Sequence, residues 1–371
     1  MTAFFDDSVS PKPRFPWYPL GLVVLFLFAA GLRFWGLERF NTLVFDEVYY
    51  TKFANNYLTQ TAFFDGHPPL SKYIIAASIW LAEQWHLGPN IGNELAGTFR
   101  TTWSYRWSAA LTGSFIPIVV AELVRQVSQN RRFALIAGSF VALDGLFLVE
   151  SRYALNNVYL VIFGLLGQLG LVLAARTLAQ RAQRLARSVT TPISPIGWRL
   201  RFWLWMIGSG VSFAAAASIK WNGLWFLLGA YGCLAIGWLY RLVAQRNLQA
   251  AQRLRLLRKM QTARQAEGTS TTENIPDLQL SPNFQFPNLE TAPTIAKRLK
   301  FQRSLFWHLG QIHPIAVILC LGILPCLVYA LIWIPHLQLN SNETFWGLQQ
   351  QILSYHQNVK SGKAVHPYCS D

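Results

Sequence analysis

Long apolar runs that alternate with charged loops constrain the fold of this 371-residue chain more than any other feature. Of its residues, 52% are hydrophobic and only 13% are charged, whereas soluble proteins carry about 25% charged residues. An apolar helix of about 20 residues crosses the hydrocarbon layer of a bilayer. The sequence therefore predicts an all-α polytopic membrane protein with about seven transmembrane helices, at residues 17–37, 107–121, 133–149, 153–175, 202–219, 221–240 and 313–334.

The loops between these runs differ in charge. Arginine and lysine gather in loops 122–132, 176–201 and 241–308, whereas most acids lie in 38–106, 150–152 and the segment after 335. Basic loops favour the cytoplasmic side of a membrane. We therefore expect a multi-pass protein of the plasma (inner) membrane, with a cytoplasmic N-terminus and the acidic loops outside. Membrane orientation accounts for the net charge of +15, so no nucleic-acid partner is expected.

The same pattern divides the chain into five parts. We expect a cytoplasmic tail, an N-terminal transmembrane catalytic module, a basic and partly disordered cytoplasmic insert, one more transmembrane helix and an extracytoplasmic segment. Within the insert, Arg241 to Gln265 is expected to be a basic helix on the anionic leaflet. Within the first outer loop, the amphipathic residues 70–85 predict a helix along the membrane surface. The expected boundaries are 1–16, 17–240 (outer loop 38–106), 241–308, 309–335 and 336–371.

Titratable residues concentrate in the first outer loop, between Asn41 and Lys72. The adjacent acids Asp46 and Glu47 come first, and Asp65 and His67 follow just before a Pro-Pro pair. Other charged residues lie at the same predicted face or one turn inside the spans, and ionisable groups at that depth usually face a cavity or a partner. These are Arg33, Arg106, Asp144, Glu150, Arg152 and Lys220.

Acids and bases together at one membrane face favour a transferase. A carboxylate can take a proton from an acceptor hydroxyl, and cations can stabilise a departing phosphate. Such a site needs no metal cofactor, although a divalent metal at Asp46-Glu47 is not excluded. Simpler roles stay open: the acid pair could cap a helix, Arg106 and Lys220 could anchor spans, and Arg33 could pair with Asp144. A non-catalytic partner subunit also stays open, whereas a transporter is disfavoured because the sequence shows no internal repeat.

Five motifs in order resemble those of protein O-mannosyltransferases, integral membrane enzymes of the GT-C glycosyltransferase class. They are VFDEVYY, FFDGHPPLSK, SYRWSAALTG, ESRYALNN and SIKWNGLW, which begin at residues 44, 63, 104, 150 and 218. The C-terminal VHPYCS resembles the start of a further family segment. The resemblance covers nearly the whole chain from about residue 20, except the insert 241–308.

The resemblance implies a donor, an acceptor and roles for several residues. The donor is polyprenyl-phosphate mannose, and the acceptor is a Ser or Thr hydroxyl of an exported protein, with inversion at the sugar. Asp46 matches the catalytic base and Glu47 its partner. Arg106 matches the arginine that binds the donor phosphate. Asp65, His67 and Lys220 match residues that line the donor site, and Arg152 and Arg33 join them as expected donor-binding residues.

The chain also departs from the family pattern. Asn157 stands where the family usually has Asp. No MIR domain is expected, and relatives continue with more spans beyond the point that corresponds to Asp371, so the sequence resembles a bacterial-type member that is truncated at its C-terminus. Transfer of another sugar, or transfer to a lipid or glycan, uses the same chemistry and stays open, as does a non-catalytic truncated homologue.

Overall fold

A computed structural model describes residues 15–187, 195–266 and 304–358 of the chain. Nearly all its regular elements are helices, and the one sheet is a two-stranded antiparallel ribbon. The helices of the first half are α1 (Trp17–Phe34), α2 (Glu47–Leu58), α3 (Leu70–Gln84), α4 (Thr102–Ser128), α5 (Arg131–Leu143), α6 (Gly145–Glu150) and α7 (Asn156–Arg187), and the ribbon pairs β1 (Gly92–Asn93) with β2 (Arg100–Thr101).

The second half of the described chain continues as helices. They are α8 (Pro195–Ala217), the 3₁₀ turn η1 (Trp221–Gly223), α9 (Leu224–Ala266), α11 (Leu305–Leu309), α12 (Pro314–Val317), the π-helical turn η2 (Ile318–Ile323), α13 (Leu324–Ile332), α14 (Ile334–Leu339) and α15 (Phe345–Asn358). Within the described residues, six helical stretches are long and apolar enough to cross a membrane: Trp17–Phe34, Thr102–Ser128, Asn156–Arg181, Gly197–Ala217, Trp221–Asn247 and Pro314–Leu339. The predicted all-α polytopic architecture is thereby confirmed.

The third predicted span, 133–149, is not one continuous helix. It divides at Asp144 into α5 and α6, and neither part alone is long enough to count as a span. Asp144 has extended backbone angles, and its carboxylate accepts a hydrogen bond from Phe147 N at 3.0 Å. Asp is a favoured N-cap residue because its side chain satisfies such an otherwise unpaired N–H. The acid therefore ends one helix and starts the next.

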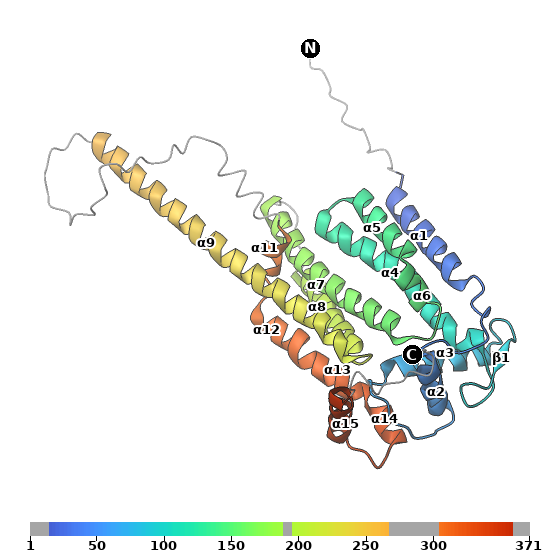
Figure 1. The fold of residues 1–371 in the computed structure, drawn as a ribbon. Helices are drawn as coiled ribbons and strands as arrows, with labels where there is room; N and C mark the ends of the chain where they lie inside the picture. Colours follow the sequence, from blue (N-terminus) through green and yellow to red (C-terminus); the bar gives the residue numbers. More distant parts are fainter. Residues whose placement is uncertain (1–14, 188–194, 267–303, 359–371) are drawn as a thin grey trace.

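The first outer loop and the later turns meet at one end of the helix bundle. Figure 1 shows α2, α3, the β1–β2 ribbon, α14 and α15 at this end, which we call the loop end. The α4–α5 junction, the end of α7 and the start of α8 lie at the opposite end. The chain therefore alternates between the two ends as the charge pattern predicted, with the α5–α6 pair taking the place of the third span.

The core of the loop end is built from α2, α3, α4 and α7. Tyr50, Ile75, Ile79, Tyr105 and Tyr159 are buried there with less than 4% of their surface exposed. A second apolar cluster joins α7, α8, α9 and η2. The predicted surface helix at 70–85 corresponds to α3, and its inner face is buried against α4, so it is part of the fold rather than an appendage.

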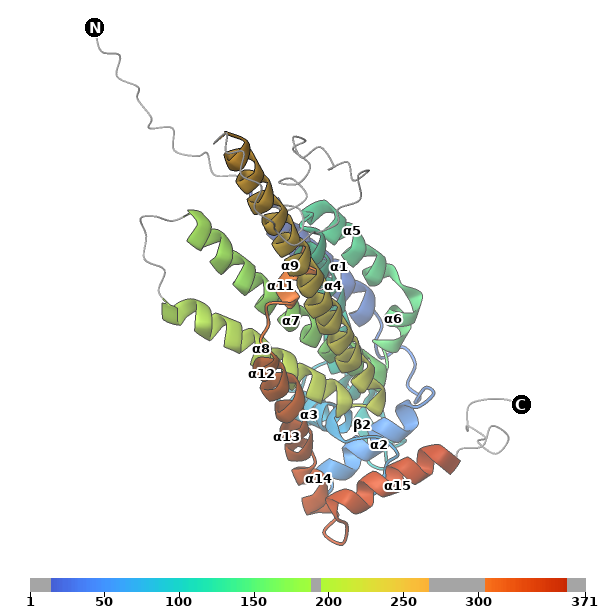
Figure 2. The ribbon, with the colours of Figure 1, turned by 90° about the vertical axis from the view of Figure 1, so that its left-hand side faces the viewer.

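Helix α9 differs most from the prediction. It runs for 43 residues without interruption, so the span predicted at 221–240 and the basic helix predicted from Arg241 are one element. Figure 2 shows its far half projecting beyond the rest of the bundle, on the side away from the loop end. The part of the insert predicted to be disordered, 267–296, lies outside the described residues, as does the C-terminal VHPYCS motif.

Candidate active site at the loop end of the bundle

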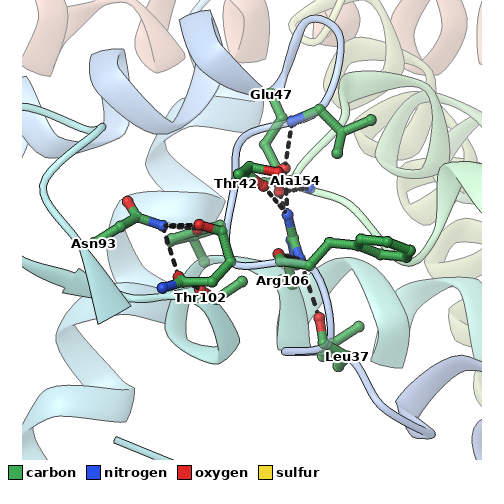
Figure 3. A network of polar contacts seen from close by, with 11 residues as sticks. Leu37, Thr42, Glu47, Asn93, Thr102, Arg106 and Ala154 are labelled. Atoms are coloured by element: carbon green, nitrogen blue, oxygen red, sulfur yellow. Dashed lines mark hydrogen bonds and ion pairs between the residues drawn. The ribbon is translucent and has the colours of Figure 1, made fainter. Parts of the chain in front are cut away.

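The first element of the site is a buried ion pair between α2 and α4. Glu47 begins α2 and Arg106 lies one turn into α4. Arg106 Nε lies 2.8 Å from Glu47 Oε1, and Arg106 Nη2 lies 2.7 Å from Glu47 Oε2 (Figure 3). The side chains are 1% and 0% exposed. Two parallel N–H···O bonds between planar groups make this a strong and geometrically specific pair.

Both partners are fully engaged by the protein. Arg106 donates its remaining N–H groups to the carbonyl oxygens of Leu37, Phe40 and Thr42, at 3.1, 2.8 and 2.7 Å. Since an arginine has five N–H donors, none remains for a donor phosphate. Glu47 also accepts the N–H groups of Val44 and Ala154, each at 3.0 Å. The pair therefore ties the first outer loop, α4 and the turn after α6 together.

A second network holds the chain just before the acid pair. The Asn41 side-chain oxygen accepts hydrogen bonds from Asn93 Nδ2 at 2.9 Å and Thr102 Oγ1 at 2.6 Å. Asn41 Nδ2 in turn donates to Gly92 O at 2.8 Å. These contacts fix the loop to the β1–β2 ribbon. They bear on the site because Asn41 and Glu47 hold the two ends of the segment that carries Asp46.

Asp46 differs from its neighbour in its surroundings. It is half-buried, it precedes the first turn of α2, and Tyr50 OH donates to its Oδ2 at 3.3 Å. Phe45, immediately before it, has a φ of +52°. A bulky residue rarely takes this conformation, and such strain is often held at functional sites. The backbone thus turns sharply so that the two acids point to different surroundings.

Lys220 supplies a positive charge beside Asp46. It lies in the turn between α8 and η1, and its ammonium lies 5.9 Å from the centre of the Tyr50 ring. Burial lowers its pKa, while the carboxylates of Asp46, Glu150 and Asp65 act in the opposite direction. Within the described part of the chain, its ammonium makes no hydrogen bond or ion pair. Lys220 therefore has donor capacity that Arg106 lacks.

Asp65 and His67 lie beside this group, in the loop that precedes α3. Asp65 pairs with the buried Lys72, which also donates to the carbonyl oxygens of His67 and Pro68 at 3.1 and 2.6 Å. Burial, together with the charges of Lys220, Lys72 and His356, lowers the pKa of His67 to about 3. His67 is consequently neutral near pH 7, when it can accept or donate a hydrogen bond but carries no charge.

Helix α15 closes over the same loop. His356 Nε2 lies 2.9 Å from Gly66 O, and the His356 ring lies 5.4 Å from that of His67 and 6.1 Å from that of Trp221. A groove of about 430 Å³ runs between Phe64 and this helix. His356, Trp221 and Tyr50 were not selected as site residues from the sequence. Only Tyr50 carried a usable signal, because it follows Asp46 by one helical turn.

Two expected donor-binding residues lie in structural positions. Arg152 donates to Leu32 O and Gly36 O at 2.8 and 3.2 Å and ties its turn to the end of α1. Arg33 is fully buried, and its Nη1 contacts Ala29 O at 3.2 Å and Ala142 O at 3.5 Å. The break at Asp144 frees carbonyls at the end of α5, which explains this use of Arg33.

The alternative partner considered for Arg33 is therefore wrong, because Asp144 is exposed and caps α6 instead. Arg33 and Arg152 both donate hydrogen bonds to backbone carbonyl oxygens. The described residues contain no group of three His, Cys, Asp or Glu side chains placed to hold a metal ion. The residues that the structure gathers are thus Asp46, Tyr50, Asp65, His67, Glu150 and Lys220, which we call the loop-end cluster.

Comparisons with known proteins show the family to which the chain belongs. Residues 23–265 match the family described as dolichyl-phosphate-mannose-protein mannosyltransferase. Over 140 residues the chain is 33% identical to Protein O-mannosyltransferase 1 of Drosophila melanogaster, covering 37% of this chain and 16% of that protein. Over 194 residues it is 29% identical to the polyprenol-phosphate-mannose–protein mannosyltransferase of Mycolicibacterium smegmatis, covering 50% of this chain and 34% of that protein.

A solved structure has the same fold. The S. cerevisiae protein O-mannosyltransferase Pmt1–Pmt2 complex bound to the sugar donor matches with a TM-score of 0.52 at 20% identity, over 88% of this chain and 35% of that chain. The chain thus spans about a third or less of the length of these relatives.

Proposed function

Because the chain belongs to the dolichyl-phosphate-mannose-protein mannosyltransferase family, we propose that it transfers mannose from polyprenyl-phosphate mannose to Ser or Thr hydroxyls of exported proteins. The loop-end cluster is the site of transfer. The chain has the fold of the GT-C membrane glycosyltransferases. In this proposal the loop end lies on the extracytoplasmic side of the plasma membrane, the N-terminus is cytoplasmic, and the partners are the lipid-linked donor, the acceptor protein and membrane lipids.

The observation that carries the proposal is the separation of the two adjacent acids. Glu47 has both carboxylate oxygens in the bidentate pair with Arg106, whereas Asp46 lies close enough to the half-buried Lys220 and Glu150 for its charge to act on both. Protonation of Glu47 would leave the buried positive charge of Arg106 unpaired, which is costly. We therefore assign the general base to Asp46 and a positioning role to Glu47.

The reaction needs one base and one cation. Asp46 takes the proton of the acceptor hydroxyl as the oxygen forms a bond with the anomeric carbon, and the bond from that carbon to the phosphate oxygen breaks. The polyprenyl phosphate leaves with the electron pair. Attack from the face opposite the leaving group gives inversion, and no covalent sugar–enzyme intermediate is required. A positioned base contributes roughly 10²–10⁴-fold to such a reaction.

Lys220 is the cation that best suits the departing phosphate. An ammonium is a compact point charge that binds phosphate well, and its donors are available, whereas those of Arg106 are used within the protein. We accordingly assign phosphate binding to Lys220 and a supporting role to Arg106. Asp65, His67 and Lys72 shape the adjoining wall, and Arg152 and Arg33 position the elements around it. No metal cofactor takes part in this proposal.

The test uses the 371-residue chain reconstituted in vesicles with polyprenyl-phosphate mannose and a Ser/Thr-containing peptide. We expect transfer by the unchanged chain and a loss of roughly 10²–10⁴-fold in Asp46→Asn, with donor binding retained. Glu94→Gln removes an exposed acid from the same loop and leaves transfer unchanged. Near-normal transfer by Asp46→Asn would overturn the assignment of the base. Failure of the unchanged chain to transfer mannose would overturn the proposal for these 371 residues.

A further inference from the structure

A polar pocket lies between α4, α7 and α8 at the end of the bundle opposite the loop end. It has a volume of about 260 Å³. Each of the three helices contributes one arginine to its wall, and three glutamines lie between them. No Asp or Glu is among the described residues that line it. The polar lining residues are Arg125, Gln126, Gln129, Arg176, Thr177, Gln180 and Arg201.

Contacts within the described residues satisfy only some of the hydrogen-bond donors of these three arginines. Arg125 pairs with Glu122, with Nε–Oε2 at 2.7 Å and Nη2–Oε1 at 2.5 Å. Arg176 donates from Nε and Nη2 to the carbonyl of Gln126 and so satisfies an oxygen at the end of α4. Its Nη1 makes no hydrogen bond within the described residues. Arg201 is exposed and has no hydrogen bond or ion pair to any described residue. Among the described residues, the three guanidinium groups of the pocket are thus balanced by one nearby carboxylate, that of Glu122, which pairs with Arg125.

The position of the pocket along α4 indicates its depth in the membrane. Arg106 and Arg125 are on the same helix, 19 residues apart, which corresponds to about 28 Å along its axis. The hydrocarbon core of a bilayer is about 30 Å thick. When the loop-end cluster lies at one membrane interface, the pocket therefore lies in the headgroup layer of the other leaflet. Trp205 lies in the wall of the pocket. Trp198 lies on the same helix, and its ring centre is 3.9 Å from Arg181 Cζ. Tryptophan is enriched at the membrane–water interface.

We propose that this pocket binds the phosphate of an anionic membrane lipid from the leaflet opposite the loop-end cluster. The planar guanidinium matches phosphate oxygens in pairs, and basic pockets between transmembrane helices bind acidic headgroups. Capping of α4 alone explains the Nε edge of Arg176, but it explains neither the unpaired Arg201 nor the absence of acids from the wall. The exposed Gln180 supplies a hydrogen bond to the polar groups next to the phosphate, whereas the amides of Gln126 and Gln129 already donate to Glu122 Oε1 and Gln126 O.

The experiment titrates the purified, delipidated 371-residue chain in detergent with short-chain phosphatidylglycerol, short-chain phosphatidylcholine or inorganic phosphate. Native mass spectrometry counts bound lipid, and the unfolding midpoint reports binding by mass action. We expect phosphatidylglycerol to bind and to raise the midpoint. Arg201→Gln should weaken its binding by about tenfold, as expected for loss of one hydrogen-bonded charge. Arg132→Gln removes an exposed arginine at the same end of the bundle but outside the pocket and should leave binding unchanged.

Three results would overturn the proposal. Equal weakening by Arg132→Gln and Arg201→Gln would mean that diffuse surface charge attracts the lipid. Equal stabilisation by inorganic phosphate and phosphatidylglycerol at the same concentration would mean that a free anion, not a lipid, is the ligand. Equal binding of phosphatidylcholine would mean that the positive charge of the pocket does not select its occupant. None of these measurements depends on mannose transfer.

Discussion

Arg106 presents one edge of its guanidinium to both carboxylate oxygens of Glu47, across 59 residues of sequence, at 2.8 and 2.7 Å. Both side chains are buried. The pair fixes the start of α2 against α4, and it thereby positions the neighbouring Asp46, which we propose as the base. In the proposed mechanism the role of the pair is therefore indirect, since it holds Asp46 in place.

Replacing Arg106 by Met should strongly destabilise the protein. Removal of one partner leaves the Glu47 carboxylate buried and unpaired, which costs about 3–5 kcal/mol. Arg39→Met, which removes an exposed arginine nearby, should change the free energy of unfolding by less than about 0.5 kcal/mol. Unfolding in detergent measures both. The double variant Glu47→Gln/Arg106→Met should recover part of the loss, and equal losses in Arg106→Met and Arg39→Met would contradict the assigned role.

Replacing Lys220 by Met should weaken the use of the donor. Loss of one charged hydrogen-bond partner of the phosphate lowers affinity by about tenfold or more, so KM for polyprenyl-phosphate mannose should rise while the unfolding midpoint changes little. Lys52→Met provides the matched control, because Lys52 is an exposed lysine on α2. An unchanged KM in Lys220→Met would return the phosphate-binding role to another cation.

Gly113 marks a close approach between α4 and the turn after α6. A Cβ at this position would lie 2.2 Å from Ser151 Cβ and 3.0 Å from Arg33 Nε. Gly113→Ala should therefore cost about 1–3 kcal/mol through overpacking. Gly31→Ala is the control, because nothing lies within 4 Å of a Cβ there, and it should be neutral or slightly stabilising. Equal stability of the two variants would show that the turn moves freely away from α4.

His67 should make the protein less stable in mild acid. Its pKa is lowered to about 3 from about 6.5 in an unfolded chain, so between these values the unfolded state binds more protons and stability falls as pH falls. For this residue alone the loss from pH 7.5 to pH 5 is about 2 kcal/mol. His67→Gln should remove that part of the pH dependence. Unfolding midpoints of both proteins at several pH values measure it, and parallel curves would exclude His67 as its source.

The sequence predicted the membrane helices and the gathering of polar loops at one end because both depend on local composition. Apolar length determines which segments can cross, and the distribution of arginine determines which loops lie together. The break in the third span also had a local signal, since Asp144-Gly145 is a favourable start for a new helix. These features need no knowledge of tertiary contacts.

The partners of Arg106 could not be predicted in this way. They depend on where the carbonyls of Leu37, Phe40 and Thr42 point, and so on the path of a loop without regular structure. The continuity of α9 was missed for a different reason. The change from apolar to basic residues at Arg241 resembles a boundary, but Arg, Gln, Leu and Ala all favour helix, so the backbone continues while only the surroundings change.

The continuity of α9 makes it a rigid rod. Its 43 residues extend for about 64 Å, and no Gly or Pro follows Gly237 in it to act as a hinge. The first residue of the rod lies four positions after Lys220. The tilt of the basic half therefore sets the tilt of the whole rod. One element thus links the two membrane faces mechanically, and it begins beside Lys220, the residue proposed to bind the phosphate.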